Sequence, residues 1–309
     1  MRRHLAVAAS GLATAALLTF APTSQAGPAE LQADDVTHHE FQVNCSVTHR
    51  LPDDPIVFPN LPGASHEHSF VGNNTTDAYS TLDSLRGAGL GATSCLAPDD
   101  LSAYWFPSMF DGDQPVVPIG RQVIYYKSGV LDYTSVRPFP TGLRFVVGSP
   151  MATLDEFRTA PGRVEGWECG NDFFNWDFPT HCLEGSQLNI RYQAPSCWDG
   201  VHLDSADHKS HMAYPVGGVC PASHPNPVPM LEFKIAFPAD GDTSRVRLAS
   251  GRGYTWHYDF FNAWDEPTLA ALVRHCINGG LQCDPRGYDQ YKPHRGAALG
   301  ENYRLPGRP

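Results

Sequence analysis

The 309-residue chain lacks the motifs of several common enzyme classes, and each absence argues against one class. There is no Gly-x-Ser-x-Gly elbow, no His-Glu-x-x-His helix and no phosphate-binding glycine loop. These gaps argue against α/β-hydrolases, zincin metalloproteases and nucleotide-binding enzymes. The cysteines show no Cys-x-x-Cys spacing, which argues against a zinc–thiolate site.

Positive charge is scarce outside the first few residues. The chain has 22 Lys and Arg against 33 Asp and Glu, a net charge of −11. Without Arg2 and Arg3, 20 basic side chains remain against 33 acidic ones, so the rest of the chain carries −13. This charge argues against nucleic acid or an anionic membrane as the partner.

Residues 1–26 have the pattern of a secretory signal peptide. Arg2 and Arg3 precede an apolar stretch over 5–21, and the small residues Ser24 and Ala26 stand at the −3 and −1 positions of the expected cleavage site. The alternative is a membrane anchor, but the apolar run is interrupted and short for a span of about 20 residues. No later segment is long and apolar enough to span a membrane. We expect a secreted, extracellular monomer with a flexible tail over 27–35 and one catalytic or binding domain over 36–309.

The eight cysteines all follow the predicted leader, and an even count in a secreted chain favours disulfides. Eight cysteines allow 105 pairings, so spacing alone does not fix the connectivity. Their order along the chain suggests sequential pairs. These are Cys45–Cys95, Cys169–Cys182, Cys197–Cys220 and Cys276–Cys283.

The 27 prolines and 28 glycines predict many turns and few long helices. Segments 41–45, 123–126, 143–147 and 232–237 alternate or are rich in strand formers, while 76–88 and 267–279 have helical spacing. Asp265 is the expected cap of the second helix. The sequence therefore predicts a mainly β, single-domain fold of the β-sandwich or jelly-roll type, with long loops, a few short helices and stabilising disulfides.

Two short histidine patterns suit strands whose alternate residues share a face. His66 and His68 form one pair, and His257 with Asp259 forms the other. Neutral imidazole is a frequent metal ligand, and a carboxylate beside histidine can orient it or join it on a metal. The structural alternatives are partly exposed histidines near a turn and a buried His–Asp hydrogen bond.

The segment 197–214 is the densest in groups that do chemistry. It contains three aspartates, including Asp199, together with His208, Lys209, His211 and Tyr214. Paired carboxylates suit glycoside hydrolysis, and histidine with tyrosine suits acid–base chemistry. The alternative is a turn-rich loop whose aspartates cap turns. His224 is a further candidate member of the set.

Six motifs together resemble a secreted domain-of-unknown-function family found in actinobacteria and fungi. They begin at His66 (HEHSFVG), Ser102 (SAYWFP), Ser196 (SCWDG), His208 (HKSHMAYP), Cys220 (CP, with His224-Pro225) and His257 (HYDFFNAW). Ala263 departs from the glycine usual in the last motif. Some fungal relatives carry sugar-binding modules, so the resemblance implies a polysaccharide or cell-wall setting.

We expect a secreted carbohydrate-active enzyme, a hydrolase of cell-wall or environmental polysaccharide, with a single shared site and metal assistance as an option. The alternatives are a secreted metal-binding protein without turnover and a non-catalytic wall protein that binds glycan. The candidate cofactor is a divalent metal (Zn, Cu or Ca). The expected roles are catalysis for Asp199, Asp259, His208 and His211, metal binding for His66, His68 and His257, and substrate binding for Tyr104, Trp105, Lys209, Tyr214 and His224. For Tyr104 and Trp105, the alternative is an ordinary place in the core.

Overall fold

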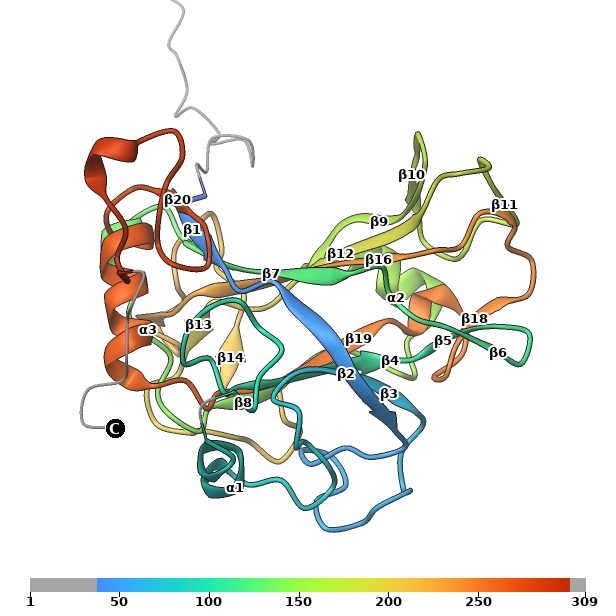
Figure 1. Cartoon of the computed structure of the whole chain (residues 1–309), viewed down its shortest axis with the longest axis horizontal. Helices are drawn as coiled ribbons and strands as arrows, with labels where there is room; N and C mark the ends of the chain where they lie inside the picture. The colour runs from blue at the N-terminus through green and yellow to red at the C-terminus, as the bar shows by residue number, and fades with distance from the viewer. Residues whose placement is uncertain (1–37, 90, 301–309) are drawn as a thin grey trace, which may run out of the picture. The chain divides into compact units, whose positions relative to one another are not determined.

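The computed structural model describes residues 38–89 and 91–300, and these residues form a mainly β fold built on one 12-stranded sheet (Figure 1). The prediction of a β-rich, disulfide-stabilised fold with few short helices is thereby confirmed. The predicted leader and tail, 1–26 and 27–35, lie outside the described residues. Within those residues, no helix has the length and apolar character needed to cross a bilayer.

The large sheet has two halves that are continuous with each other. One half runs in the order β10 (Asp172–Asn175), β9 (Arg163–Cys169), β12 (Leu188–Gln193), β16 (Met230–Phe237) and β7 (Arg121–Lys127). The other runs in the order β2 (Cys45–Leu51), β3 (His68–Gly72), β4 (Ala103–Pro107), β19 (His257–Phe261) and β8 (Arg144–Gly148). At the edge of the first half, β1 (Glu40–Gln42) pairs with β7 and with β20 (Gln282–Cys283).

Smaller sheets and short helices complete the fold. One small sheet pairs β11 (His181–Cys182) with β17 (Gly241–Asp242). A second has the order β14 (Met212–Ala213), β13 (Cys197–Trp198) and β15 (Asn226–Pro227). A third has the order β18 (Val246–Leu248), β5 (Met109–Asp111) and β6 (Gln114–Val116). The helices are α1 (Leu82–Gly87), α2 (Leu154–Thr159) and α3 (Glu266–Leu272), with a π turn, η4 (Val273–Ile277), directly after α3. Short 3₁₀ turns are η2 (Tyr133–Ser135), η3 (Gly253–Thr255) and η5 (Pro293–Arg295).

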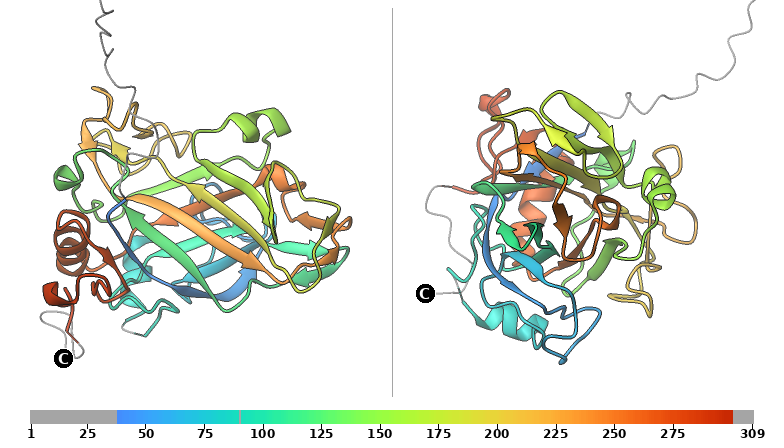
Figure 2. Two further views of the ribbon diagram at one scale, coloured as in Figure 1. Left: turned by 90° about the horizontal axis from the view of Figure 1, so that it is seen from above. Right: turned by 90° about the vertical axis from the view of Figure 1, so that its right-hand side faces the viewer.

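The sheet curls so that its two halves face each other as two layers (Figure 2). The layers of the predicted sandwich are thus halves of one sheet, joined where the start of β2 pairs with Arg121 and Gln122 of β7. Between them lies a large aromatic core that includes Trp167, Phe233 and Phe260. The predicted strand 41–45 is divided between β1 and β2, because Asn44 has a φ of 48° and breaks the extended chain.

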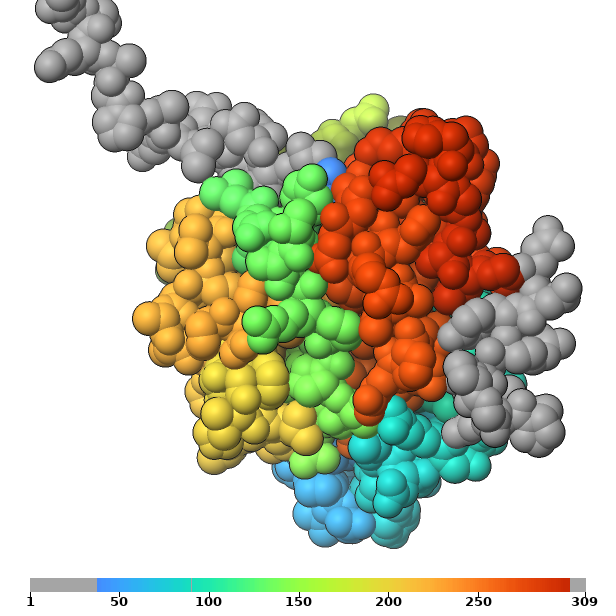
Figure 3. Space-filling view, turned by 90° about the vertical axis from the view of Figure 1, so that its left-hand side faces the viewer, coloured from blue at the N-terminus to red at the C-terminus, as the bar shows by residue number. Residues whose placement is uncertain are grey.

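Both predicted helices are present but shorter than expected. α1 begins only after Thr81, whose side chain accepts a hydrogen bond from the Ser84 amide, because Asp77 and Ser80 form a separate turn before it. α3 follows the predicted cap, and Asp265 accepts a hydrogen bond from the Thr268 amide. The segment after α3 packs beside η2 (Figure 3), where Asn278 donates to two main-chain carbonyls.

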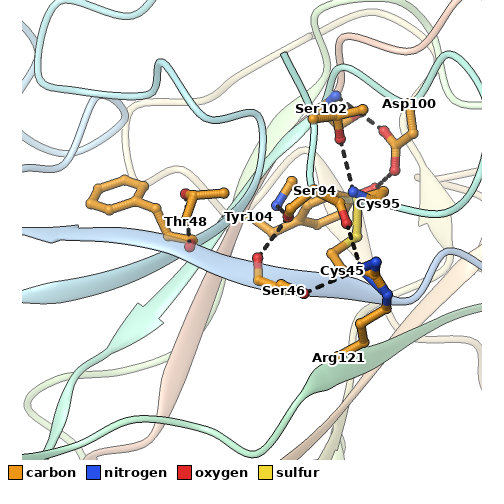
Figure 4. The surroundings of a disulfide bond; sticks show 12 residues. Cys45, Ser46, Thr48, Ser94, Cys95, Asp100, Ser102, Tyr104 and Arg121 are labelled. Carbon is orange, nitrogen blue, oxygen red and sulfur yellow. Dashed lines mark hydrogen bonds between the residues drawn. A yellow bond between two sulfur atoms is a disulfide. The ribbon is translucent and has the colours of Figure 1, made fainter. Parts of the chain in front are cut away.

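All four disulfides form with the predicted sequential pairing. Cys45–Cys95 ties the start of β2 to the loop before β4, next to buried Asp100 (Figure 4). Asp100 accepts a hydrogen bond from the Tyr104 hydroxyl at 2.6 Å, and burial raises its pKa to about 7. Four disulfides and no free cysteine among the described residues indicate an oxidising compartment.

The outer face of the second layer carries a smaller apolar cluster that includes Phe70, Trp105 and Phe261. The segment 52–67, drawn in blue below β3 in Figure 1, covers this face and buries Ile56 against it. Strand residues alternate between the two faces. Tyr258 and Phe260 therefore enter the main core, while His257 and Asp259 lie on the covered outer face.

Candidate metal centre

Three histidines from three segments meet on this covered outer face. His66 lies near the end of the covering segment, His68 begins β3, and His257 begins β19. The Nε2 atom of His257 lies 3.1 Å from Nε2 of His66 and 3.4 Å from Nε2 of His68. The donor atoms of all three lie within 4.8 Å of one another. We call these three residues the histidine triad.

Main-chain carbonyls fix the orientation of two of the rings. Nδ1 of His68 lies 2.9 Å from the Asp53 carbonyl oxygen, and Nδ1 of His257 lies 2.9 Å from the Thr255 carbonyl oxygen. A carbonyl only accepts, so each Nδ1 carries the proton and each Nε2 presents a lone pair. Two lone pairs therefore face each other across 3.4 Å, an arrangement that a bound cation between them would stabilise.

Burial keeps the triad neutral. It lowers the pKa of His257 to about 3 and that of His66 to about 4, and it lowers the pKa of His68 well below its usual range. Neutral imidazole is the form that binds metals. Tetrahedral zinc with bonds of about 2.0–2.1 Å places its ligand atoms roughly 3.3–3.4 Å apart. The distances in the triad are close to that spacing, and His66 is only half-buried, which leaves one side open.

Two carboxylates lie beside the triad. Asp259 follows His257 by two residues on the same face, and Asp54 comes from the covering segment. Donor atoms of Asp54, His68 and Asp259 lie within 4.8 Å of one another. Burial raises the pKa of Asp259 well above its usual range, the Asp54 charge raises it further, and Lys209 opposes both. Burial also raises the pKa of Asp54, against hydrogen bonds from the Val57 and Ile56 amides.

The covering segment is held down by Asp53. Its carboxylate accepts hydrogen bonds from the Gly63 amide at 2.8 Å and the Ala78 amide at 3.1 Å, and its carbonyl orients His68. The sequence analysis did not identify Asp53, Asp54 or Thr255. The aspartates lie between Pro52 and Pro55, a composition typical of a turn, and Thr255 acts through its main chain.

Lys209 and His208 lie at the rim of this centre. The Lys209 ammonium donates to the carbonyl of Gly148, the residue paired with His257, and its charge acts on both His257 and Asp259. His208 bonds through Nδ1 to Asp204 at 2.8 Å, and its charge acts on Asp54. The structure therefore places both residues near the carboxylates but outside the triad.

His211 and Asp199 lie elsewhere, so three of the five expected histidines converge. His211 is buried, with Nδ1 bonded to Ser205 and Nε2 to the Arg144 carbonyl, which holds the loop against β8. Asp199 accepts hydrogen bonds from the Val201 and His202 amides in a turn, which lower its pKa to about 2. It does not pair with Asp259. Both residues line a separate cavity of about 550 Å³.

The expected substrate-binding residues other than Lys209 do not surround the triad. Tyr104 and Trp105 are fully buried on opposite faces of β4, so neither ring is exposed to a glycan. Tyr214 is half-buried and donates to the Gln193 carbonyl beside a separate cavity of about 230 Å³. His224 bonds to Ser223 and to the Ser210 carbonyl.

Comparison with known proteins gives the family. No curated protein and no solved structure matches the chain. One family does match, over residues 54–264, a stretch that includes the whole triad and both buried carboxylates. Since this stretch is more than half of the chain, the protein belongs to the family described as Domain of unknown function (DUF1996).

Proposed function

We propose that this is a secreted metal-dependent protein in which His66, His68 and His257 bind a divalent transition metal, and that the metal assists hydrolysis of an extracellular polysaccharide. The observation that carries the metal site is the pair of lone pairs on His68 and His257, which face each other 3.4 Å apart. Three imidazoles favour Zn²⁺ or Cu²⁺ over Mg²⁺ or Ca²⁺, which prefer oxygen donors.

Hydrolysis is supported by the composition of the site. Three histidines leave a fourth position on zinc for water, and zinc lowers the pKa of that water to about 7. The half-buried edge of His66 gives the open side. Asp259, whose oxygens have no hydrogen-bond partner among the described residues, lies beside His68 and would supply a carboxylate next to the metal.

A polysaccharide substrate is supported by the expected secretion, by the disulfides and by exposed rings in the covering segment and in the loop bonded to it. Phe58 is 37% exposed and Tyr79 is 57% exposed. Their segments are joined by the hydrogen bond from the Asn60 amide to the Ala78 carbonyl. Exposed aromatic rings suit stacking on sugar rings. Sequence analysis did not single out these two residues.

A second candidate is metal binding without turnover, and burial is the observation that favours it. His68 is 0% exposed and His257 is 3% exposed, so only the His66 side of the triad reaches the surface. A closed site of this kind suits a structural or stored ion, since structural zinc sites are closed and catalytic ones keep an open position.

The test separates the two candidates. Untagged, secreted protein is assayed for bound metals, then stripped, reloaded and incubated with a panel of polysaccharides with and without Zn²⁺ or Cu²⁺. We expect one equivalent of metal at the triad, lost in H66A/H68A and kept in H202A, because the exposed His202 ring bonds Asp199, away from the triad. Metal-dependent release of sugar supports the hydrolase. Stoichiometric metal without product supports the second candidate, and a chain that never binds metal overturns both.

A further inference from the structure

We infer that Asp54 and Asp259 bind a second divalent cation directly beside the histidine triad. The inference rests on the proposed metal centre, because His68 borders both sites. Donor atoms of Asp54, His68 and Asp259 lie within 4.8 Å of one another. Oxygen donors at about 2.1–2.6 Å from a shared ion are separated by distances within that limit. Since Nε2 of His68 points at His257 and belongs to the first site, the two carboxylates are the ligands of the second ion.

The state of Asp259 is the observation that points to a ligand. Its side chain is 1% exposed, and neither carboxylate oxygen has a hydrogen-bond partner within residues 38–89 and 91–300. Buried polar atoms in folded proteins nearly always have a partner, so two orphaned oxygens on one carboxylate require an explanation. A cation between Asp259 and Asp54 gives these oxygens their missing partner.

Two main-chain hydrogen bonds hold the Asp54 carboxylate in position beside Asp259. Asp54 is 4% exposed, and one of its oxygens accepts hydrogen bonds from the Ile56 and Val57 amides, both at 2.9 Å. These two bonds set the carboxylate at the start of the turn that covers β3 and β19. The indole N–H of Trp105, on the adjoining strand β4, acts on Asp54 as a donor and lowers its pKa. Among the described residues, the acceptor atoms left without a partner beside Asp54 are thus the two oxygens of Asp259.

The local charges also leave room for a cation. Neither Asp54 nor Asp259 forms an ion pair with any described residue. The Lys209 charge lowers the pKa of Asp259 without a direct contact, because its ammonium donates to the Gly148 carbonyl. His208 acts on Asp54 but bonds to Asp204. Two buried carboxylates without a paired cation are unfavourable, and a divalent ion balances both.

The donor types indicate the class of ion. Carboxylate oxygens favour Mn²⁺, Mg²⁺ or Ca²⁺, in contrast to the nitrogen donors of the triad. The two sites would then hold different ions in one centre. In two-metal hydrolases the paired ions stabilise the attacking and the leaving oxygen, so a second ion deepens the proposed hydrolysis.

The experiment counts ions in the full secreted protein and uses Mn²⁺ as the probe. Stripped protein is loaded with one equivalent of Zn²⁺ and titrated with Mn²⁺, followed by native mass spectrometry and by electron paramagnetic resonance of bound Mn²⁺. We expect two ions per chain. D259N and D54N should each lose only the Mn²⁺, H66A should lose only the Zn²⁺, and the matched control D199N should keep both.

The outcomes separate this inference from the proposed function. One Zn²⁺ and no Mn²⁺ in the natural protein overturns the second site and leaves the triad standing. Two ions retained in D259N also overturns it. No ion at all overturns both ideas. Because Asp259 has no hydrogen bonds to lose, D259N should fold, and its melting temperature should no longer rise when Mn²⁺ is added; an undiminished rise contradicts the inference.

Discussion

The Nε2 atoms of His68 and His257 lie 3.4 Å apart, and each ring donates its other nitrogen's proton to a main-chain carbonyl. His66 can donate to only one of them at a time, through the nitrogen that lies 3.1 Å from His257. The metal-free triad therefore keeps at least one lone pair that faces another. The folded chain should gain stability when an ion takes the position between them.

The first prediction concerns this gain. At a metal concentration about 100 times the dissociation constant, Zn²⁺ should add about 2.7 kcal/mol to the free energy of unfolding of the natural protein. H257A should show almost none of this gain. Denaturant unfolding with and without Zn²⁺ measures it, with H224A as the control because His224 bonds elsewhere. Equal gains in H257A and in the natural protein would contradict the triad.

The second prediction concerns Asp53. D53A leaves the Gly63 amide and the buried Ala78 amide without their acceptor and should cost about 1–3 kcal/mol of stability. D53A keeps the main-chain carbonyl that orients His68, but loss of the two carboxylate bonds frees the segment that carries it, so metal affinity should fall by about 10-fold. Isothermal titration calorimetry and chemical unfolding measure the two effects. D83A, an exposed change in α1, should alter neither, and unchanged metal affinity in D53A would refute the argument.

The third prediction concerns Lys209. Its positive charge acts on Asp259, so K209M should strengthen binding of Mn²⁺ at the carboxylates by several fold. Lys234 lies exposed on β16 in the other layer, and K234M should leave the affinity unchanged. Titration followed by electron paramagnetic resonance gives both constants. Weaker binding in K209M would show instead that Lys209 holds the site together.

The fourth prediction concerns pH and Asp100, which lies far from the triad in sequence and inside the main core. Burial raises its pKa in the folded chain to about 7, above the ordinary value of 3.8. The folded state therefore holds the proton more tightly, and stability falls as pH rises from about 4 to about 7. The loss from this group is at most about 4 kcal/mol.

The D100N variant tests this directly. Its free energy of unfolding should lack the decline between pH 4 and pH 7 that Asp100 causes, while the hydrogen bond from Tyr104 to the side-chain oxygen can remain. Urea unfolding at a series of pH values measures the slope. D132N, at an exposed turn, is the control. The same slope in D100N as in the natural chain would show that another group titrates.

Local sequence patterns were enough to predict much of the fold. A content rich in strand formers marked β7 and β8, alternation marked β16, and the order of cysteines matched all four disulfides. The helix start at Thr81 was missed, because the Asp77–Ser80 turn has residues that also suit a helix. The apolar run around Trp105 fitted two interpretations, a strand buried on both faces and a surface with aromatic rings that stack on sugars. The two have the same composition, and the strand is in fact buried at every position.

The candidate site was only partly predictable. The spacing of His66 with His68 and of His257 with Asp259 gave the shared faces correctly, since strand geometry is local. Their meeting depends on β4 lying between β3 and β19, which no local pattern encodes. The dense segment with Asp199 and His211 attracted attention for its composition, yet its groups mostly satisfy one another within the loop.

Alternation along β19 has a final consequence for how this chain folds. Trp256, Tyr258 and Phe260 enter the aromatic core, while His257 and Asp259 face the candidate centre. Because strands alternate with a period of two, a slip of one residue against β4 or β8 would send the imidazole and carboxylate into the core. A refolding chain should therefore bind the metal only after β19 has paired with β4 and β8 in the native register.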